Sequence, residues 1–245
     1  MTALLQAPDA DLGDALAAGL HGPPPRDLAA FHAAFVALVE AGATDPDTAW
    51  DAFYDATLTR VDAGWGRDRP GSGTVAVFTR IWSRAAALSR GRTVLDVGSC
   101  FAFLSLAWAA RPGAPRLLAV DLDHASAALA HRQARRLGLA VGVLRADGGR
   151  LPLPDHGVDT VLLLHVLEHL DAATADVVLA EALRVAARRV VVAVPVEAEP
   201  DPVFGHVQVY DLPRLASTGA ATGWTCTLAD ADGAWLVLNR PGPRP

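Results

Sequence analysis

One stretch, from Arg92 to Leu106, constrains the fold of this chain more than any other. A short run of β-branched and apolar residues at 93–97 meets a carboxylate and a glycine, and then passes into an apolar run of helical length. This order predicts a strand, a tight turn and a helix, which open a doubly wound α/β sheet. Gly98 permits turn angles that other residues avoid, so the N–H groups that start the helix face the crevice where such sheets bind ligands.

The glycines missing from this turn narrow the class of ligand. A dinucleotide site has the pattern G-x-G-x-x-G because a pyrophosphate must approach bare backbone. Here the register is Gly98-x-Cys100-x-x-Phe103, which disfavours a NAD-dependent oxidoreductase but leaves it as an alternative. A phosphate-binding loop ending in Gly-Lys-Ser/Thr is excluded, because the chain contains no lysine. A ligand with an adenosine and no phosphates fits this turn better.

Strand and helix patterns alternate through the rest of the chain. We expect further strands at 116–121, 141–146, 158–164 and 189–194, helices at 101–110, 123–137, 172–187 and 212–221, and a hairpin of 224–228 with 234–239 around Asp232-Gly233. The predicted fold class is therefore α/β, with a doubly wound, mostly parallel sheet of seven strands.

The N-terminal part of the chain has a different pattern. Helices are predicted at 11–20, 26–41 and 45–62, and Asp45-Pro46 supplies the cap and the first helical residue of the third. A glycine-rich loop ends at Gly73, and a helix at 74–89 leads into the first strand. We therefore divide the chain into a helical cap or substrate-lid region at 1–73 and a catalytic domain at 74–245.

Three carboxylates follow successive strands of the predicted sheet. Asp96 lies at the end of the first strand, Asp121 ends the second, and Asp147 follows the third. The carboxyl ends of parallel strands meet at one edge of a sheet, so we expect these side chains to line one crevice. Asp121 lies roughly 20 residues beyond the glycine turn, the spacing at which an acidic side chain accepts both hydroxyls of a ribose.

The run Asp96-x-Gly98-x-Cys100-x-Ala102 resembles motif I of the class I S-adenosylmethionine-dependent methyltransferases, whose usual form is acidic-x-Gly-x-Gly-x-Gly. The resemblance implies a Rossmann-like methyltransferase fold and S-adenosylmethionine as cofactor. It also implies that Asp96 and the turn backbone hold the methionine end and that Asp147 accepts the adenine amino group. The expected cofactor-binding residues are Asp96, Gly98, Ser99, Cys100, Asp121, Leu122, Asp147, Gly148 and His165.

The segment His165-Val-Leu-Glu168-His169 carries the second group of candidate residues. Its spacing, H-x-x-E-H, is also that of an inverted zinc-peptidase helix, although the apolar run before His165 indicates a strand end. A simpler interpretation places His165 behind the cofactor and has Glu168 cap the next helix. A third interpretation joins Glu168 and His169 to His206, from the loop after the fifth strand, as catalytic residues.

These three side chains offer two routes to an activated acceptor. As ligands they would hold a divalent metal, Mg²⁺ or a similar ion, an arrangement similar to that of metal-dependent methyltransferases acting on ribose hydroxyls. Those enzymes have a glutamate where this chain has His165. In the other route His206 is the base, because sugar hydroxyls have very high pKa values and need one.

The expected reaction is methyl transfer to a hydroxyl. The chain lacks the Asn/Asp-Pro-Pro-Tyr/Phe signature of amino-methylating enzymes and has no Pro-Cys pair for attack on cytosine. The run 96–104, with Gly205-His206-Val207 and Tyr210-Asp211-Leu212, looks like the mycofactocin oligosaccharide methyltransferases, which implies a glucose hydroxyl of a redox-cofactor glycan as acceptor. A quinone, phenol or amine acceptor and a non-catalytic binding module remain alternatives.

Composition limits the expected partners and compartment. The formal net charge of -6 argues against a nucleic-acid surface, and two cysteines make no disulfide framework. No apolar run approaches the ~18 residues that a membrane span needs. We expect a cytoplasmic protein that acts on a small molecule or an oligosaccharide, without nucleic acid or a membrane as partner.

Overall fold

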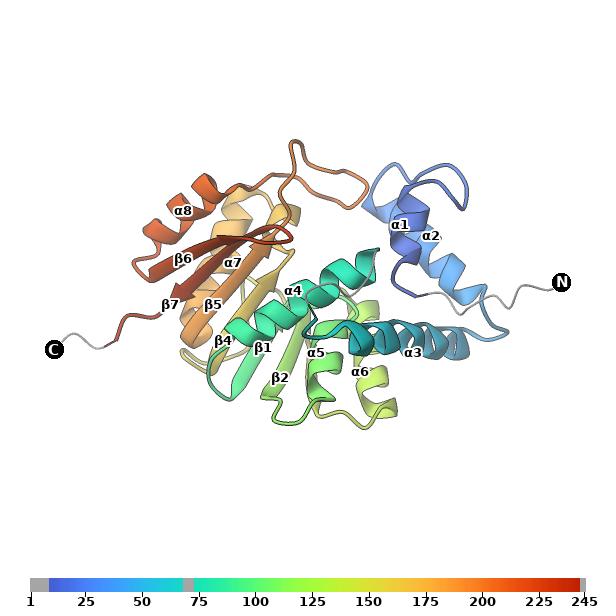
Figure 1. Cartoon of the computed structure of the whole chain (residues 1–245), viewed down its shortest axis with the longest axis horizontal. Coiled ribbons are helices and arrows are strands. Elements are labelled where there is room, and N and C mark those ends of the chain that lie inside the picture. The colour runs from blue at the N-terminus through green and yellow to red at the C-terminus, as the bar shows by residue number, and fades with distance from the viewer. Residues whose placement is uncertain (1–8, 68–72, 243–245) are drawn as a thin grey trace. The chain divides into compact units, whose positions relative to one another are not determined.

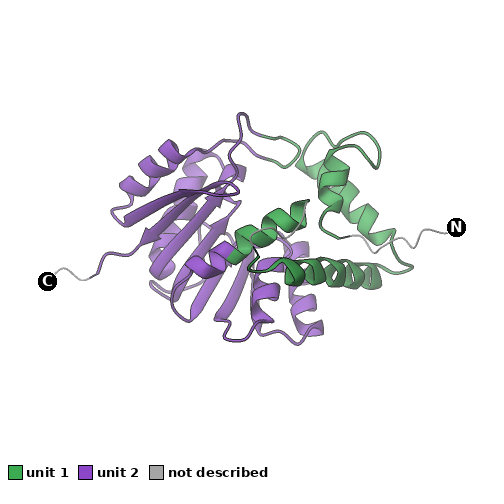
Figure 2. Cartoon of the chain, in the orientation of Figure 1, with its two compact units in different colours: residues 1–83, 201–205 green, residues 84–200, 206–245 purple. Residues whose placement is uncertain are grey.

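The computed structural model describes residues 9–67 and 73–242. Residues 68–72, in the glycine-rich loop predicted before Gly73, lie outside the described part of the chain. The chain forms two compact units, one of residues 1–83 with 201–205 and one of residues 84–200 with 206–245 (Figure 2). The role of residues 1–73 as a substrate lid stays a prediction.

The first unit is helical. It contains α1 (Leu12–Ala17), α2 (Leu28–Glu40), α3 (Pro46–Gly64) and the first part of α4 (Thr74–Leu88). At the start of α3, Oδ1 of Asp45 accepts the backbone N–H groups of Asp47 and Thr48 at 3.0 and 3.2 Å. This cap satisfies two donors that the first helical turn leaves without partners, so α3 begins where the sequence predicts.

Aromatic side chains form the core of this unit. The ring of Phe53 is fully buried and meets Phe35 and Trp50 edge to face, with ring centroids 5.6 and 5.4 Å away. Edge-to-face contacts place the positive ring edge against the negative ring face, which adds to the gain from burial. The amphipathic pattern that predicts α2 and α3 is therefore the pattern that packs them together.

The second unit contains one seven-stranded sheet in the order β3-β2-β1-β4-β5-β7-β6 (Figure 1). The strands are β1 (Thr93–Val97), β2 (Arg116–Asp121), β3 (Val141–Arg145), β4 (Val158–Leu164), β5 (Ala186–Val194), β6 (Thr225–Asp230) and β7 (Ala234–Asn239). The first five are parallel, and β7 and β6 add an antiparallel hairpin at one edge. The predicted fold, a mostly parallel seven-stranded α/β sheet, is confirmed.

Helices follow the parallel strands. They are α5 (Phe103–Ala109), α6 (His124–Arg136), α7 (Ala172–Val185) and α8 (Leu212–Ala221), with a short 3-10 turn at Leu167–His169. In β4, Val161, Leu162 and Leu163 all have no exposed surface, although neighbouring side chains point to opposite faces of a sheet. Burial of each such side chain contributes roughly 1.5–3 kcal/mol, and a strand buried on both faces is typical of parallel sheets.

The register of the sheet places the glycine turn at its switch point. Val97 of β1 pairs with Val120 of β2 on one side and with Leu163 of β4 on the other. The chain therefore runs outward in opposite directions from β1 and β4. Ligands of open α/β sheets bind outside the carboxyl ends of the strands at such a point.

The predicted ends of two helices are wrong, and one of these is α1, which ends at Ala17 rather than at residue 20. The sequence pattern extends the helix at 172–187 into alanines that favour helices, but α7 ends at Val185 and Ala186 begins β5. Ala186 pairs with Val158 of β4, so a hydrogen-bonded position in the sheet overrides the local helix preference of alanine.

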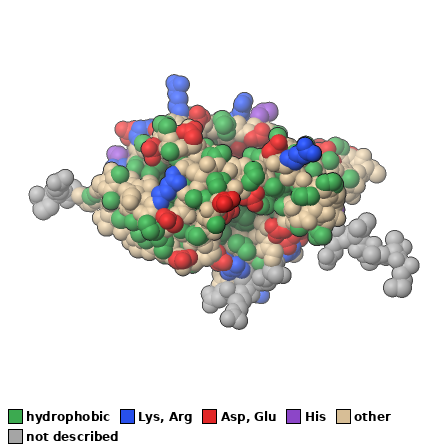
Figure 3. Space-filling view, turned by 90° about the horizontal axis from the view of Figure 1, so that it is seen from above, with side chains coloured by type: hydrophobic (Ala, Val, Ile, Leu, Met, Phe, Trp, Pro, Cys, Tyr) green, Lys and Arg blue, Asp and Glu red, His purple; other side chains and the backbone are tan. Residues whose placement is uncertain are grey.

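Arginine and acidic side chains are interspersed on the described surface seen in Figure 3. Within the described residues, no helix is both long and apolar enough to cross a membrane.

Candidate functional site

The turn after β1 is closed by its contacts with β2 and with the end of β4. The N–H groups of Gly98 and Ser99 both donate to the carbonyl oxygen of Val120, at 2.8 and 3.0 Å. Gly98 has φ +70, and a Cβ atom there would lie 2.7 Å from Cγ2 of Val166. Both the backbone angle and the space require glycine, as the sequence pattern indicates.

Cys100 and Ala102 keep the backbone of the glycines that they replace in the motif. Their φ angles are +48 and +54, in the left-handed region where residues other than glycine are uncommon. Holding such a residue in this region costs roughly 1–2 kcal/mol. The surrounding structure therefore holds Cys100 and Ala102 in backbone angles that glycine would adopt without strain.

Asp121 fastens this turn from the end of β2. Its Oδ2 accepts the backbone N–H of Cys100 at 2.6 Å, and its Oδ1 accepts the backbone N–H of Asp123 at 2.9 Å. Each carboxylate oxygen can accept a second hydrogen bond, so both remain able to accept a ribose hydroxyl. The predicted ribose contact is compatible with this geometry and stays a prediction.

Asp96 lies buried beneath the turn. Its Oδ2 accepts a hydrogen bond from Oγ of Ser105 at 3.2 Å. Burial raises the pKa of the Asp96 carboxyl to about 7, and the nearby carboxylate of Asp121 raises it further against the opposing effect of Ser105.

The predicted adenine-binding residues lie beyond β2 and β3. Asp147 is exposed, and its Oδ1 accepts the N–H of Gly149 at 2.8 Å. Gly148 lies close to β1, since a Cβ atom there would be 3.0 Å from Cγ1 of Val97. Leu122, next to Asp121, is 65% exposed and available to cover a flat ring.

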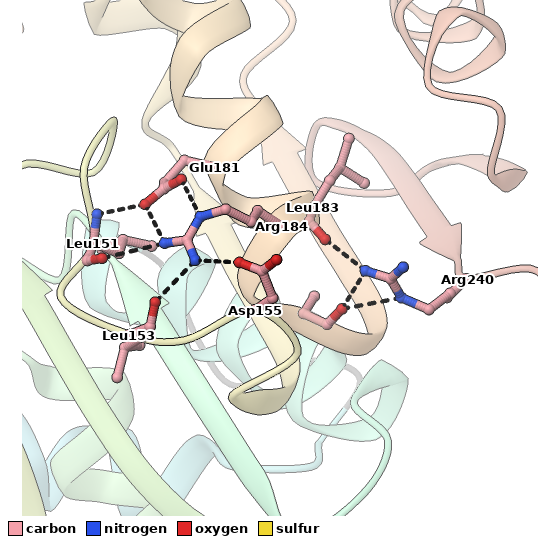
Figure 4. A network of polar contacts seen from close by, with 8 residues as sticks. Leu151, Leu153, Asp155, Glu181, Leu183, Arg184 and Arg240 are labelled. Atoms are coloured by element: carbon pink, nitrogen blue, oxygen red, sulfur yellow. Dashed lines mark hydrogen bonds and ion pairs between the residues drawn. The ribbon is translucent and has the colours of Figure 1, made fainter.

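An ion-pair network in Figure 4 holds the segment after Asp147 against α7. The Arg184 guanidinium contacts both carboxylate oxygens of Glu181, at 2.6 and 2.7 Å, and Oδ1 of Asp155 at 2.7 Å. It also donates to the carbonyl oxygens of Leu151 and Leu153. Sequence reasoning missed this network, because single arginines on a helix give no signal of the loop that they bind.

The segment after β4 buries a carboxylate. Glu168 is 1% exposed, and neither of its oxygens forms a hydrogen bond with a described residue. Nδ1 of His165 lies 3.4 Å from Oε1 of Glu168. Burial raises the pKa of Glu168 to about 8 and, together with His206 and His169, lowers the pKa of His165 to about 4.

The helix cap assigned to Glu168 and the zinc-peptidase interpretation are both wrong, whereas the position of His165 behind the cofactor stays a prediction. Glu168 does not cap α7, because Asp171 does so by accepting the N–H of Thr174 at 3.0 Å. The zinc-peptidase pattern needs its residues on one helix, whereas His165 follows a strand and only a 3-10 turn covers Leu167–His169.

His206 reaches this segment from the loop after β5. The N–H of Val207 donates to the carbonyl oxygen of Glu168 at 2.8 Å, and Nε2 of Gln208 donates to the carbonyl oxygens of Leu167 and Leu170. These bonds bring His206 to His169, with ring centroids 4.9 Å apart. One ligand atom from each of Glu168, His169 and His206 lies within 4.8 Å of the others, the grouping that the sequence predicts.

Glu197 completes this cluster. Its Oε2 lies 2.7 Å from Nδ1 of His206, whose side chain is 8% exposed. A histidine that donates through Nδ1 to a carboxylate presents the lone pair of Nε2 on its other side. Sequence reasoning missed Glu197, because an acidic residue in a loop has no spacing that identifies its partner.

Comparison with known proteins identifies the type of domain. Residues 95–194 match the model of a family described as methyltransferase domain. This region therefore resembles a methyltransferase domain, and it spans less than half of the chain. A protein of Mycobacteroides abscessus named "Uncharacterized methyltransferase" is 35% identical over 99 residues, which are 40% of this chain and 38% of that protein. The match therefore spans well under half the length of that relative.

Solved structures agree with the fold of the methyltransferase domain. An S-adenosylmethionine-dependent methyltransferase from Aquifex aeolicus has a TM-score of 0.51 at 21% identity, covering 64% of this chain and 85% of that one. Magnesium protoporphyrin IX methyltransferase from Synechocystis PCC 6803, with bound S-adenosylhomocysteine, has a TM-score of 0.56 at 15% identity, covering 80% and 100%. The cyclase SpnF has a TM-score of 0.59 at 20% identity, covering 77% and 93%, so this fold alone does not define a reaction.

The methyltransferase domain has groups suited to S-adenosylmethionine. Oγ of Ser99 is buried in the turn after β1 and forms no hydrogen bond with a described residue. Buried hydroxyls are nearly always hydrogen-bonded, so this atom is a donor or acceptor that a bound ligand would satisfy. Together with the carboxylates of Asp96 in β1 and Asp121 in β2, this group fits a cationic nucleoside without phosphates.

The second unit also has a hollow of about 600 Å³ at the amino ends of β1 and β2. Arg92, Trp108 and Arg116 are among its lining residues. Its lining includes none of the predicted cofactor-binding or catalytic residues, which lie at the carboxyl ends of the strands.

Proposed function

We propose that the protein is an S-adenosylmethionine-dependent O-methyltransferase that acts on a hydroxyl of a small molecule or a glycan. The observation that carries this proposal is the cluster of Glu168, His169 and His206 beside the glycine turn. Val166, two residues before Glu168, is the side chain that a Cβ at Gly98 would meet. A group that activates an acceptor is thus adjacent to the turn expected to hold the methyl donor.

The cofactor supplies a methyl group already activated by its sulfonium, so the protein chiefly aligns the acceptor and excludes water. In this proposal Asp96 and the turn at 98–100 hold the methionine end, with Ser99 as a further polar contact. Asp121 holds the ribose, and Asp147 with Gly148 holds the adenine. Leu122 and His165 complete the pocket wall.

His206 is the proposed base. Its Nδ1 is engaged by Glu197 at 2.7 Å, which orients the ring and stabilises the imidazolium that forms when Nε2 takes a proton. A sugar hydroxyl has a very high pKa, so its proton must leave as the methyl group arrives. A divalent metal held by Glu168, His169 and His206 would serve the same purpose by polarising the hydroxyl.

The acceptor class rests on sequence features. The chain lacks the signature of amino-methylating enzymes, and its resemblance to mycofactocin oligosaccharide methyltransferases favours a glucose hydroxyl. Within this proposal the protein acts in the cytoplasm on a small molecule or an oligosaccharide.

The test is incubation of the protein with methyl-labelled S-adenosylmethionine and glycan-bearing extract, followed by mass spectrometry of the product. We expect a labelled ether on a sugar, which His206→Ala abolishes while cofactor binding persists. His131→Ala, at an exposed position of α6, is the matched control and should keep full turnover. A labelled amine would contradict O-methylation, and binding without turnover on any acceptor would indicate a non-catalytic module.

A further inference from the structure

We infer that Glu168, His169 and His206 bind a divalent transition metal such as Zn²⁺ or Co²⁺ in preference to Mg²⁺. The role of such a metal in catalysis rests on the proposed function, but its binding does not. Two imidazoles and one carboxylate come from two segments, the turn after β4 and the loop after β5. Glu168, His169 and His206 themselves all belong to the unit of residues 84–200 and 206–245.

The geometry is close to that of a metal centre. The three ligand atoms lie within 4.8 Å of one another. Ligand atoms around a tetrahedral zinc ion, with bonds of about 2.1 Å, are about 3.4 Å apart. The ligand atoms would therefore move closer to one another by up to about 1.4 Å when the metal binds.

Glu168 supplies an independent observation. Its side chain is 1% exposed, and both oxygens lack a hydrogen-bond partner among the described residues. A buried carboxylate without hydrogen bonds is costly, and such groups in proteins are usually paired or bound to a metal. A cation between Glu168 and the two imidazoles would satisfy this carboxylate.

The surroundings of His206 resemble those of a metal ligand. A metal-bound histidine usually donates its other ring N–H to a carboxylate, which fixes its orientation. Glu197 holds Nδ1 of His206 in this way at 2.7 Å, so Nε2 is the atom that would bind the metal. The bond from the N–H of Val207 to the carbonyl oxygen of Glu168 fixes the two segments to each other.

The donor set decides the class of metal. Mg²⁺ prefers six oxygen ligands and keeps much of its water, whereas imidazole nitrogen suits zinc, cobalt, iron and nickel. Three protein ligands also leave a coordination position open, as in catalytic zinc sites. That position is where the oxygen of an acceptor hydroxyl would bind.

The test measures metal binding without acceptor or turnover. Tag-free protein, stripped with a chelator and dialysed, is titrated with Zn²⁺, Co²⁺ and Mg²⁺ by calorimetry, and the Co²⁺ complex is followed by its visible absorption. We expect one equivalent of Zn²⁺ or Co²⁺ per chain and far weaker binding of Mg²⁺. Glu168→Gln, which keeps the shape of the side chain, should lose at least tenfold in Zn²⁺ affinity, and Glu197→Gln should lose 10–100-fold.

The controls separate this inference from the proposed function. His131→Ala should bind Zn²⁺ like the wild type, whereas His169→Ala should lose the cobalt absorption bands. Equal Zn²⁺ affinity in the wild type and in all three cluster variants would overturn the inference. If methyl transfer persisted fully in chelator, only the role of the metal in catalysis would be overturned. If the protein bound the metal but transferred no methyl group, only the proposed function would be overturned.

Discussion

The carboxylate of Asp121 accepts the backbone N–H of Cys100 at 2.6 Å. The same side chain therefore holds the glycine turn in place and is the one predicted to accept the ribose hydroxyls. Asp121→Ala removes both contributions. We expect its affinity for S-adenosylmethionine to fall 10–100-fold, about 1.4–2.7 kcal/mol, as measured by calorimetry. Asp230→Ala, an exposed carboxylate at the end of β6, is the matched control and should bind like the wild type. Unchanged affinity in Asp121→Ala would remove this residue from the cofactor site.

Because the backbone at Ala102 is left-handed, we expect a glycine substitution there to have an unusual effect on stability. Ala102→Gly should leave the free energy of unfolding unchanged or raise it by up to about 1 kcal/mol, because relief of the left-handed strain offsets the greater freedom of the unfolded chain. Ala128→Gly, in the middle of α6, should lower the free energy of unfolding by about 1 kcal/mol. Denaturant unfolding of both variants distinguishes them, and equal losses would contradict the backbone assigned to Ala102.

The Arg184 network predicts coupling between α7 and the segment that follows Asp147. Arg184→Ala should leave the carbonyl oxygens of Leu151 and Leu153 without this donor. We expect faster amide hydrogen exchange across residues 149–157 and weaker cofactor binding, because Asp147 would lose its anchored neighbour. Arg135→Ala, exposed near the end of α6, is the control. An unchanged exchange rate at 149–157 would contradict the positioning role.

The lowered pKa of Asp159 leads us to expect that the fold loses stability in acid. Its carboxylate accepts the backbone N–H of Arg92 and contacts Arg188, and these interactions, the Arg92 bond first, lower its pKa from 3.8 to about 2. A lowered folded-state pKa stabilises the fold above pH 4, and this stability is lost as the pH falls toward 2. We expect Asp159→Asn to remove about 1–2 kcal/mol of that pH dependence, after allowance for solvent screening. Identical acid unfolding curves for the two proteins would contradict the ion pair.

The raised pKa of Asp96 leads us to expect that cofactor affinity depends on pH. Because its pKa is raised to about 7, the carboxyl is largely neutral at pH 6 and charged at pH 8. A cationic methionine end favours the charged form, so the affinity for S-adenosylmethionine should rise about tenfold from pH 6 to pH 8, with a proton released on binding. Calorimetry in buffers of different ionisation enthalpy measures that proton. Asp96→Asn should show neither effect, and a pH-independent affinity in the wild type would contradict contact between Asp96 and the cation.

Regular patterns in the sequence predict most of the fold. The strands at 116–121 and 158–164 and the helix at 212–221 begin and end where their patterns do, because alternation, capping and glycine signals are local. The end of α7 is different, since it depends on the pairing of Ala186 with Val158, a contact between residues far apart in the sequence.

The sequence likewise predicts some residues of the candidate site and gives no signal for others. The grouping of Glu168, His169 and His206 follows from strand order, which brings the ends of β4 and β5 together. Glu197 and Arg184 were missed because their partners lie in irregular loops. The cap assigned to Glu168 was wrong because Asp171, closer to the first turn of α7, provides it.

A crystal structure of the protein with S-adenosylhomocysteine would locate the cofactor site directly. We expect the nucleoside at the carboxyl ends of β1, β2 and β3, with its ribose hydroxyls on Asp121 and its adenine amino group on Asp147. A nucleoside bound elsewhere, or side chains filling that crevice in its presence, would contradict this expectation.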